Sequence, residues 1–220
     1  MRYYPVNLDI QNRKCLVVGG GGVGTRKVVT LLDCGAIVTV VSPVATEKLI
    51  ALAKDNRITL NQRPYETSDI KGMFLVIGAT DHEELNQQVY RDAQQHTILC
   101  NIADKPEACH FILPAIVNRG DLVISISTSG KSPAFAKQLR KDLQVQFGDE
   151  YAEFLTLMGA IREKLLDDDH EPEVHKPLFE QLISSDLVDM IKAGRKEAID
   201  SILKETLGEG YAYDRLLAGE

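Results

Sequence analysis

The feature that most constrains the fold of this chain is a glycine-rich stretch between an apolar segment and an amphipathic one. Residues 19–24 read Gly-Gly-Gly-Gly-Val-Gly, which satisfies the pattern G-x-G-x-x-G. The apolar run before it predicts a β-strand from Lys14 to Gly19, and the apolar spacing after it predicts a helix from Gly22 to Cys34. A strand, a glycine turn and a helix in this order are typical of the first unit of a dinucleotide-binding domain.

The glycines of this pattern have separate expected roles. Gly19 permits the tight turn, Gly21 lets the backbone approach a pyrophosphate, and Gly24 allows close packing of the helix on the sheet. The anion would then meet free N–H groups and the positive end of the helix dipole. The alternative is a flexible glycine loop without a ligand.

The first half of the chain alternates short apolar runs with amphipathic stretches, which predicts βα units and a Rossmann-type parallel sheet. Gly35 is expected to end the first helix, and Asp81 with Glu84 resembles a capping box at the start of the third. Besides the first strand and helix, the expected strands are Ile37–Val41, Ile58–Leu60, Phe74–Gly78 and Ile98–Asn101, and the expected helices are Thr46–Lys54 and His82–Gln95.

The pattern changes after this sheet. Alternating residues from Leu122 to Ser127 predict a half-polar strand, and Ser132 followed by Pro133 predicts the start of a helix that runs to about Gln146. From Tyr151 onward the chain is expected to be helical and acidic, with an exposed turn at residues 167–172.

Composition narrows the class of protein. With 220 residues, 44% of them hydrophobic, the chain can bury one good core and a smaller appended unit. Residues 1–147 carry a net charge of +3 and residues 148–220 a net charge of −10, and no basic stripe suggests nucleic acid as a partner. There is neither a membrane-spanning run nor a signal-peptide pattern, and the four cysteines lack paired spacing, so we expect a cytoplasmic protein with reduced thiols.

The ends of two expected strands bear on the cofactor. Ser42-Pro43-Val44 follows the second strand, where an acid usually binds the ribose of NAD, so Ser42 or the neighbouring backbone must replace it. No arginine is present there for a 2′-phosphate, which favours NAD over NADP. An ordinary strand-to-helix turn is the alternative. Thr80, after the fourth strand, could bond the cofactor, whereas Asp81 is expected to serve only as a cap.

Several short blocks in a fixed order resemble one family, that of precorrin-2 dehydrogenase / sirohydrochlorin ferrochelatase, which includes the N-terminal module of siroheme synthase. The resemblance spans about residues 3–150, and without a methyltransferase domain the chain is most similar to the stand-alone form. The blocks are Gly19 to Lys27, Ala79-Thr80-Asp81, Asn101-Ile102-Ala103-Asp104, Phe111 to Ala115, and Ser127 to Pro133.

This resemblance implies the oxidation of precorrin-2 to sirohydrochlorin with NAD⁺, and in some members the insertion of Fe²⁺, as a substrate, to give siroheme. It implies a homodimer with exchanged segments. The expected parts are an NAD-binding Rossmann domain (1–113), a dimerisation and tetrapyrrole-site segment (114–150) and a helical C-terminal region (151–220).

The resemblance also implies site residues. Family cofactor contacts fall on Gly22, Val23, Pro43 and Val44, to which we add Asn101, and the essential acid falls on Asp104. The tetrapyrrole site is expected to include Thr128, Ser129 and Ser132 and, because the substrate's carboxylates call for positive groups, Arg119 and Lys131; a solvated basic surface is the alternative for these two. No resident metal is expected, since a lone histidine such as His110 is more often structural than a ligand.

Asp104 also fits a catalytic role on physical grounds. It follows the last expected Rossmann strand, and removing hydride from carbon commonly needs a nearby base for the accompanying proton. The alternative is that Asp104 only caps a turn with Lys105 and Pro106.

Two other functions remain open at the level of sequence. One is a non-catalytic, dinucleotide-sensing regulatory module, which would need the glycine turn but not Asp104. The other is a Rossmann dehydrogenase of a different small molecule. The role of residues 151–220 and the capacity for iron insertion are likewise open.

Overall fold

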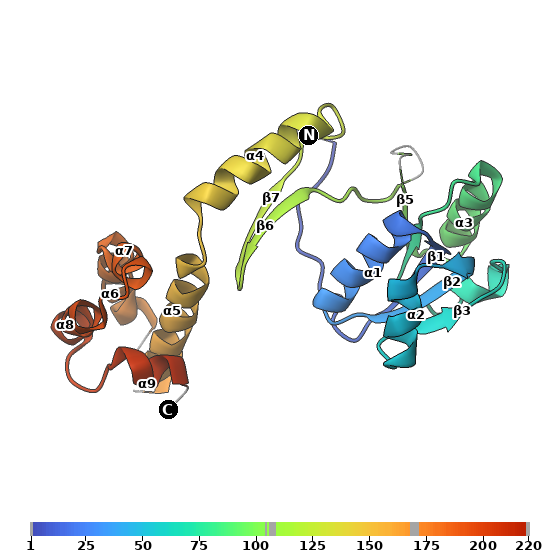
Figure 1. Cartoon of the computed structure of the whole chain (residues 1–220). Helices are drawn as coiled ribbons and strands as arrows, with labels where there is room; N and C mark the ends of the chain where they lie inside the picture. The colour runs from blue at the N-terminus through green and yellow to red at the C-terminus, as the bar shows by residue number, and fades with distance from the viewer. Residues whose placement is uncertain (1, 104, 106–108, 168–171, 219–220) are drawn as a thin grey trace. The chain divides into compact units, whose positions relative to one another are not determined.

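The computed structural model describes residues 2–103, 105, 109–167 and 172–218 (Figure 1). The chain divides into two compact units, Met1–Leu113 and Pro114–Glu220, which are described separately below.

The first unit is built on a five-stranded, wholly parallel sheet with the strand order β3-β2-β1-β4-β5. The chain begins with the central strand β1, adds β2 and β3 on one side of it, and then adds β4 and β5 on the other side. This reversal of strand order next to β1 is typical of a Rossmann-type domain and confirms the expected fold class. In chain order the elements are β1 (Lys14–Gly20), α1 (Gly22–Asp33), β2 (Ile37–Ala45), α2 (Glu47–Lys54), β3 (Thr59–Asn61), the 3₁₀ turn η1 (Thr67–Ile70), β4 (Leu75–Gly78), α3 (Glu83–Gln95) and β5 (Leu99–Ile102).

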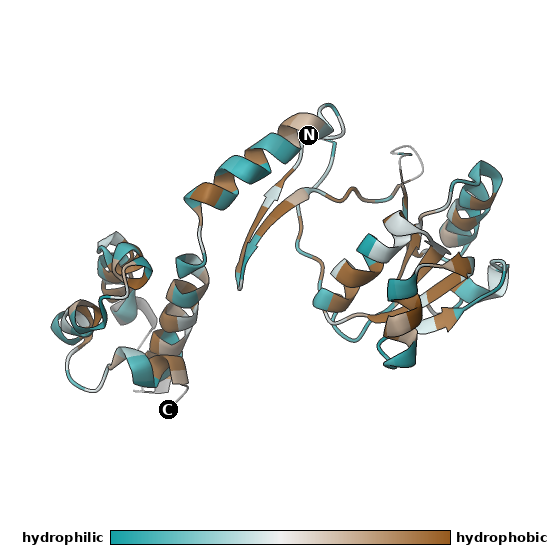
Figure 2. Ribbon diagram, in the orientation of Figure 1, coloured by the Kyte–Doolittle hydropathy of each residue, from teal (hydrophilic) through white to brown (hydrophobic). Residues whose placement is uncertain are grey.

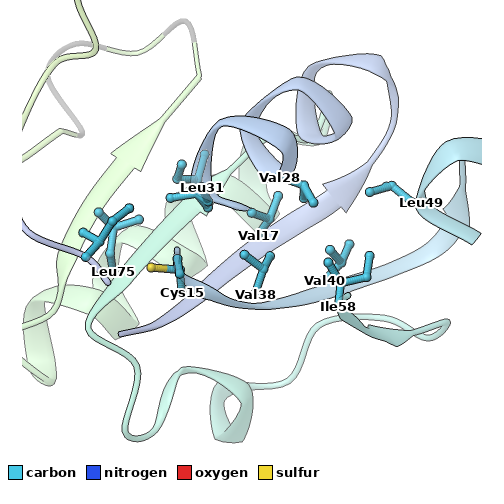
Figure 3. Close-up of a cluster of buried hydrophobic side chains, with 12 residues drawn as sticks. Cys15, Val17, Val28, Leu31, Val38, Val40, Leu49, Ile58 and Leu75 are labelled. Carbon is cyan, nitrogen blue, oxygen red and sulfur yellow. The ribbon is translucent and has the colours of Figure 1, made fainter. Parts of the chain in front are cut away.

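Alternate residues of the strands fill two apolar layers. Cys15 and Val17 of β1 pack with Val28 of α1 and Leu49 of α2 on one face of the sheet (Figure 3). On the other face Leu16 of β1 and its strand neighbours pack against α3 and η1. Both faces of a parallel sheet are therefore covered, which explains the nearly continuous apolar runs of the strands (Figure 2).

Two predictions about element ends were wrong. β2 continues beyond the expected end at Val41 to Ala45, because the pairing of β1 with β2 shifts register after Val18 and resumes at Gly20 opposite Ala45. Asp81 does not cap α3: His82 occupies the N-cap position without a side-chain hydrogen bond to the helix.

The second unit begins with an antiparallel hairpin, which was expected only in its second strand. The elements are β6 (Ala115–Arg119), β7 (Leu122–Ile126), α4 (Pro133–Gln146), α5 (Glu150–Asp167), α6 (Pro172–Ser184), α7 (Leu187–Lys192), α8 (Lys196–Leu207) and α9 (Tyr213–Ala218). As predicted, Ser132 caps α4, its hydroxyl accepting the N–H of Phe135 at 3.3 Å.

The helices after α4 have a hydrophobic core of their own, in which Leu157, Ile161, Leu182, Ile199 and Leu203 are fully buried. The expected helical C-terminal region is thus confirmed, while the turn expected at residues 167–172 falls mostly outside the described residues. No helix in the described part of the chain is long and apolar enough to cross a membrane.

Candidate active site

The turn between β1 and α1 excludes a side chain at Gly19, Gly20 and Gly24; on Gly20 a Cβ would lie 2.3 Å from the carbonyl oxygen of Val44. Gly19 has a φ of +116°, and a Cβ there would lie 2.3 Å from the carbonyl oxygen of Ala79. A Cβ on Gly24 would lie 2.0 Å from the carbonyl oxygen of Gly19. The expected roles of Gly19 and Gly24, a tight turn and a close approach of the helix, are therefore visible in the geometry.

The other side of the turn is open. Gly21 is the N-cap of α1 and Gly22 its first residue; both are exposed, and a Cβ on either would meet no atom within 4 Å. No side chain caps this helix and its first turn has no acidic residue. The N–H groups of Gly22, Val23 and Gly24 have no intrahelical acceptor, so this end of α1 fits the pyrophosphate of a dinucleotide.

Two threonines that sequence reasoning missed hold this turn in shape. Thr25 donates its hydroxyl to the carbonyl of Gly21 at 2.9 Å and lies 2.8 Å from the hydroxyl of Thr46. Thr46 caps α2 through the N–H of Leu49, and its own N–H donates to Gly20 at 3.0 Å. The starts of α1 and α2 are thereby tied together. The available signal was a threonine directly before an amphipathic run.

The end of β2 has no carboxylate in the usual ribose position. Ser42 is buried, and its hydroxyl donates to the carbonyl of Val44 at 2.7 Å. Pro43 is exposed and Val44 is 77% exposed. Of the two expected ways to contact a ribose, the Ser42 hydroxyl and the neighbouring backbone, the second is the more accessible.

Thr80, at the end of β4, has a local partner for its hydroxyl. The hydroxyl donates to the amide oxygen of Asn86 at 3.0 Å and accepts the N–H of His82 at 3.2 Å. The Asn86 amide donates back to the Thr80 carbonyl at 2.9 Å. Thr80 with Asn86 therefore forms the start of α3 that Asp81 was expected to cap; the buried Asn86 was not identified from the sequence.

The end of β5 is hydrogen-bonded to the segment that begins at Cys109. Asn101 is buried and its amide donates to the carbonyl of Phe111 at 2.9 Å, so this expected cofactor contact has a structural partner. Lys105 forms an ion pair with Glu83, which lowers the pKa of that carboxyl. The expected acid, Asp104, lies outside the described residues.

His110 also contributes to these contacts with β5. Its ring Nδ1 accepts the backbone N–H of Cys100 at 3.3 Å, and its backbone N–H donates to the carbonyl of Cys100 at 2.9 Å. Burial, and to a smaller extent Cys109, raises the pKa of the Cys100 thiol to about 12, so Cys100 remains protonated. Within the ranges that the structure describes, no group of three or more His, Cys, Asp or Glu could hold a metal ion.

The hydroxyl-rich stretch expected to bind the tetrapyrrole forms the turn between β7 and α4. Thr128 accepts the N–H of Ser132 at 3.2 Å, and its carbonyl accepts the N–H of Lys131 at 3.0 Å. Ser129 has a φ of +52° and, like Lys131, is exposed. The structure thus brings these four expected residues together in one turn.

Arg119 is not part of that turn. Its guanidinium donates to the carbonyls of Phe147 at 2.8 Å and Gln144 at 3.1 Å, and lies 3.4 Å from the carboxylate of Asp149. Both carbonyls belong to the C-terminal end of α4, where positive charge is favourable. The contacts therefore give Arg119 a role as a helix cap, while the substrate contact expected from the sequence stays a prediction.

Comparison with known proteins agrees with this geometry. A family described as putative NAD(P)-binding matches residues 6–115, and one described as sirohaem biosynthesis protein central matches residues 119–146. A siroheme synthase from Nitrosococcus oceani is 35% identical over 96% of this chain and 45% of its own length, and one from Ruthia magnifica is 34% identical over 96% and 46%. The chain thus spans about half the length of these relatives.

Among solved structures, a protein described as SirC, precorrin-2 dehydrogenase, has a TM-score of 0.75 to this chain at 26% identity. The match covers 92% of this chain and 100% of that protein. The putative NAD(P)-binding match covers the whole sheet with its glycine turn, and the second match covers β7 and the whole of α4, with only the last residue of β6. The chain therefore belongs to the family described as putative NAD(P)-binding, and it carries in its second unit a segment that matches the sirohaem biosynthesis protein central model.

Proposed function

We propose that this chain oxidises precorrin-2 to sirohydrochlorin with NAD⁺ as the hydride acceptor. The observation that carries the proposal is the open glycine turn at the start of α1, in a chain that matches a solved precorrin-2 dehydrogenase over that protein's full length. The siroheme synthases that resemble the chain support the same pathway.

The reaction removes one hydride and one proton from the tetrapyrrole. Bound NAD⁺ supplies the acceptor for the hydride. The N–H groups of Gly22, Val23 and Gly24 would hold its pyrophosphate, and the backbone at Pro43 and Val44 would contact a ribose. Asp104, which comes two residues after Ile102 in the sequence, would act as the base for the proton that leaves with the hydride.

The substrate carries several carboxylates, which calls for cationic and hydroxyl groups. We assign Thr128, Ser129, Lys131 and Ser132 to this task, because they form one turn and Lys131 is exposed there. Carboxylate oxygens accept from ammonium and hydroxyl groups, and charge-assisted bonds of this kind are the stronger ones.

The hairpin and α4, within residues 114–150, serve as a dimerisation segment in this proposal. A two-stranded sheet is marginal by itself and has two unpaired edges. On one of its faces Ile116 is 40% exposed and Val123 is 46% exposed, and Phe135 of α4 is 56% exposed. A second copy of the chain would bury these side chains, so we propose a homodimer.

We place the reaction in the cytoplasm. The cysteines are free thiols, and Cys34 is exposed, which is in keeping with a reducing compartment. NAD is favoured over NADP by the absence of an arginine at Ser42 to Val44, and the comparison of NAD⁺ with NADP⁺ belongs in the assay below.

The experiment is to incubate the purified chain with precorrin-2 and NAD⁺ and to follow the absorbance of sirohydrochlorin. Turnover that is abolished in Asp104→Ala, with coenzyme binding by calorimetry retained, supports the proposal. Coenzyme binding without turnover by the parent protein would instead favour a sensing module, and turnover of simple alcohols or acids another dehydrogenase. Addition of Fe²⁺ after the first step measures iron insertion separately.

A further inference from the structure

Two threonine hydroxyls form a chain of hydrogen bonds between the glycine turn and the start of α2. The Thr25 hydroxyl donates to the carbonyl of Gly21 at 2.9 Å and lies 2.8 Å from the hydroxyl of Thr46. The Thr46 hydroxyl accepts the N–H of Leu49 at 3.4 Å. Each hydroxyl can donate one bond and accept another, so all three bonds form together when Thr46 donates to Thr25. The chain of bonds then runs from α2 to the carbonyl of Gly21.

The end of this chain fixes the direction of an N–H group at the start of α1. The carbonyl of Gly21 and the N–H of Gly22 belong to one planar trans peptide, in which the two groups point in opposite directions. The Gly21 carbonyl accepts both the N–H and the hydroxyl of Thr25, each at 2.9 Å. Because two donors hold the carbonyl, the Gly22 N–H is held pointing the opposite way, out of the helix end.

The preceding peptide is held as well. Thr46 donates its own N–H to the carbonyl of Gly20 at 3.0 Å, and that carbonyl shares a peptide with the N–H of Gly21. A Cβ on Gly20 would lie 2.3 Å from the carbonyl oxygen of Val44, so the turn lies close against the end of β2. Thr25 and Thr46 thus hold two successive peptides of the turn, from the starts of two different helices.

The glycines at residues 19–22 give this restraint a consequence for binding. Glycine has more backbone freedom than any other residue, so a loose glycine turn loses conformational entropy when a ligand orders it. A Cβ on Gly21 or Gly22 would meet no atom within 4 Å, so packing restrains these two residues little. The bonds from Thr25 and Thr46 order the turn before a ligand arrives, which favours binding.

We propose that Thr25 and Thr46 are positioning residues for the coenzyme: their linked hydroxyls keep the Gly22 N–H directed at the pyrophosphate before NAD⁺ binds. The inference rests on the proposed function for the place of the coenzyme, and it concerns binding and not the chemical step. Loss of the link should therefore weaken the binding of NAD⁺ and leave the rate at saturating coenzyme as it is.

The test compares Thr25→Val, which keeps the shape of the side chain without its hydroxyl, with Thr25→Ser, which keeps the hydroxyl. Thr30→Val is the matched control, because the Thr30 hydroxyl also donates to a carbonyl one turn back, that of Arg26 at 3.1 Å, farther along the same helix. Calorimetry should show Kd for NAD⁺ raised about fivefold or more in Thr25→Val and within about twofold of the parent in Thr25→Ser and Thr30→Val. KM for NAD⁺ should follow Kd, with kcat within about twofold.

Thr46→Val tests whether the two hydroxyls act as one unit. If they do, the double variant Thr25→Val/Thr46→Val should bind NAD⁺ no more than about twofold more weakly than the weaker of the two single variants. A double variant in which the two single effects multiply would overturn the shared link. An unchanged Kd in Thr25→Val, or an equal loss in Thr30→Val, would overturn the positioning role.

The proposed function and this inference fail in different ways. A parent protein that binds NAD⁺ without oxidising precorrin-2 would remove the proposed reaction, while the order of Kd values among the variants would still decide the role of the threonines. A parent protein that binds no NAD⁺ would overturn both.

Discussion

The carbonyl oxygen of Gly19 occupies the space that a side chain on Gly24 would need, at 2.0 Å from its Cβ. Because the nearest obstacle is backbone, Gly24→Ala must push α1 away from β1. We expect this substitution to lower the free energy of unfolding by about 2 kcal/mol or more and to abolish NAD⁺ binding. Thermal denaturation and calorimetry measure the two effects.

Gly21→Ala, in the same turn, should separate binding from stability. A Cβ on Gly21 meets nothing within 4 Å, and its φ of −78° suits any residue. We expect the free energy of unfolding to stay within about 0.5 kcal/mol of the parent and the affinity for NAD⁺ to fall about tenfold or more. Unchanged affinity in the Gly21→Ala protein would argue against a pyrophosphate at this helix end.

Arg119→Ala should destabilise the second unit because it removes the donors at the end of α4. Hydrogen bonds to charged groups contribute about 1.5–3 kcal/mol each, so we expect a loss of about 2 kcal/mol. Arg119→Lys should not restore it, since an ammonium cannot reproduce the planar fork. Lys141→Ala, an exposed change on the same helix, is the control. Equal unfolding midpoints for Arg119→Ala and the parent would contradict the capping role.

Asp69 should make stability depend on pH in the acidic range. Its carboxylate accepts from Arg63 at 2.6 and 2.8 Å, and this contact holds the pKa of Asp69 below its ordinary value of 3.8. A lowered pKa in the folded state stabilises at pH values above the ordinary one, and the contribution is lost as the pH falls below it. The stability difference between the parent and Asp69→Asn should therefore be constant from pH 8 to about pH 5 and shrink below about pH 4.

Val123→Glu should weaken the proposed dimer by placing a charge on the exposed face of the hairpin. Light scattering after size exclusion should give the mass of one chain for the variant and of two for the parent. Ile183→Glu, which changes an equally apolar residue that is 64% exposed on α6, is the control. Dissociation by Ile183→Glu with an intact Val123→Glu dimer would move the interface elsewhere.

Much of the first unit could be predicted from the sequence because its signals are local. An apolar run followed by glycines and then by apolar residues at helical spacing usually folds as a strand, a turn and a helix. The strands and helices expected in this unit are all present. The end of β2 could not be predicted, since its last residues belong to the strand only through pairing of Gly20 with Ala45.

The site was less predictable because polar side chains have several partners to choose from. Thr80 and Asn101 were expected to face a cofactor, yet each has a partner within the protein, Asn86 and Phe111, that lies six or more residues away. Arg119 was expected in the tetrapyrrole site, and its hydrogen bonds to the C-terminal end of α4 were not foreseen. Long-range partners of this kind leave no periodic signal in the sequence.

Val44, the second-last residue of β2, is 77% exposed, and none of the residues from Ser42 to Val44 has a charged side chain. If a coenzyme ribose binds here as proposed, discrimination between the two nicotinamide coenzymes would depend on main-chain shape and not on repulsion of a phosphate. A single acidic or basic substitution at Val44 lies outside both apolar layers of the sheet, so coenzyme choice can evolve there at little expense to folding.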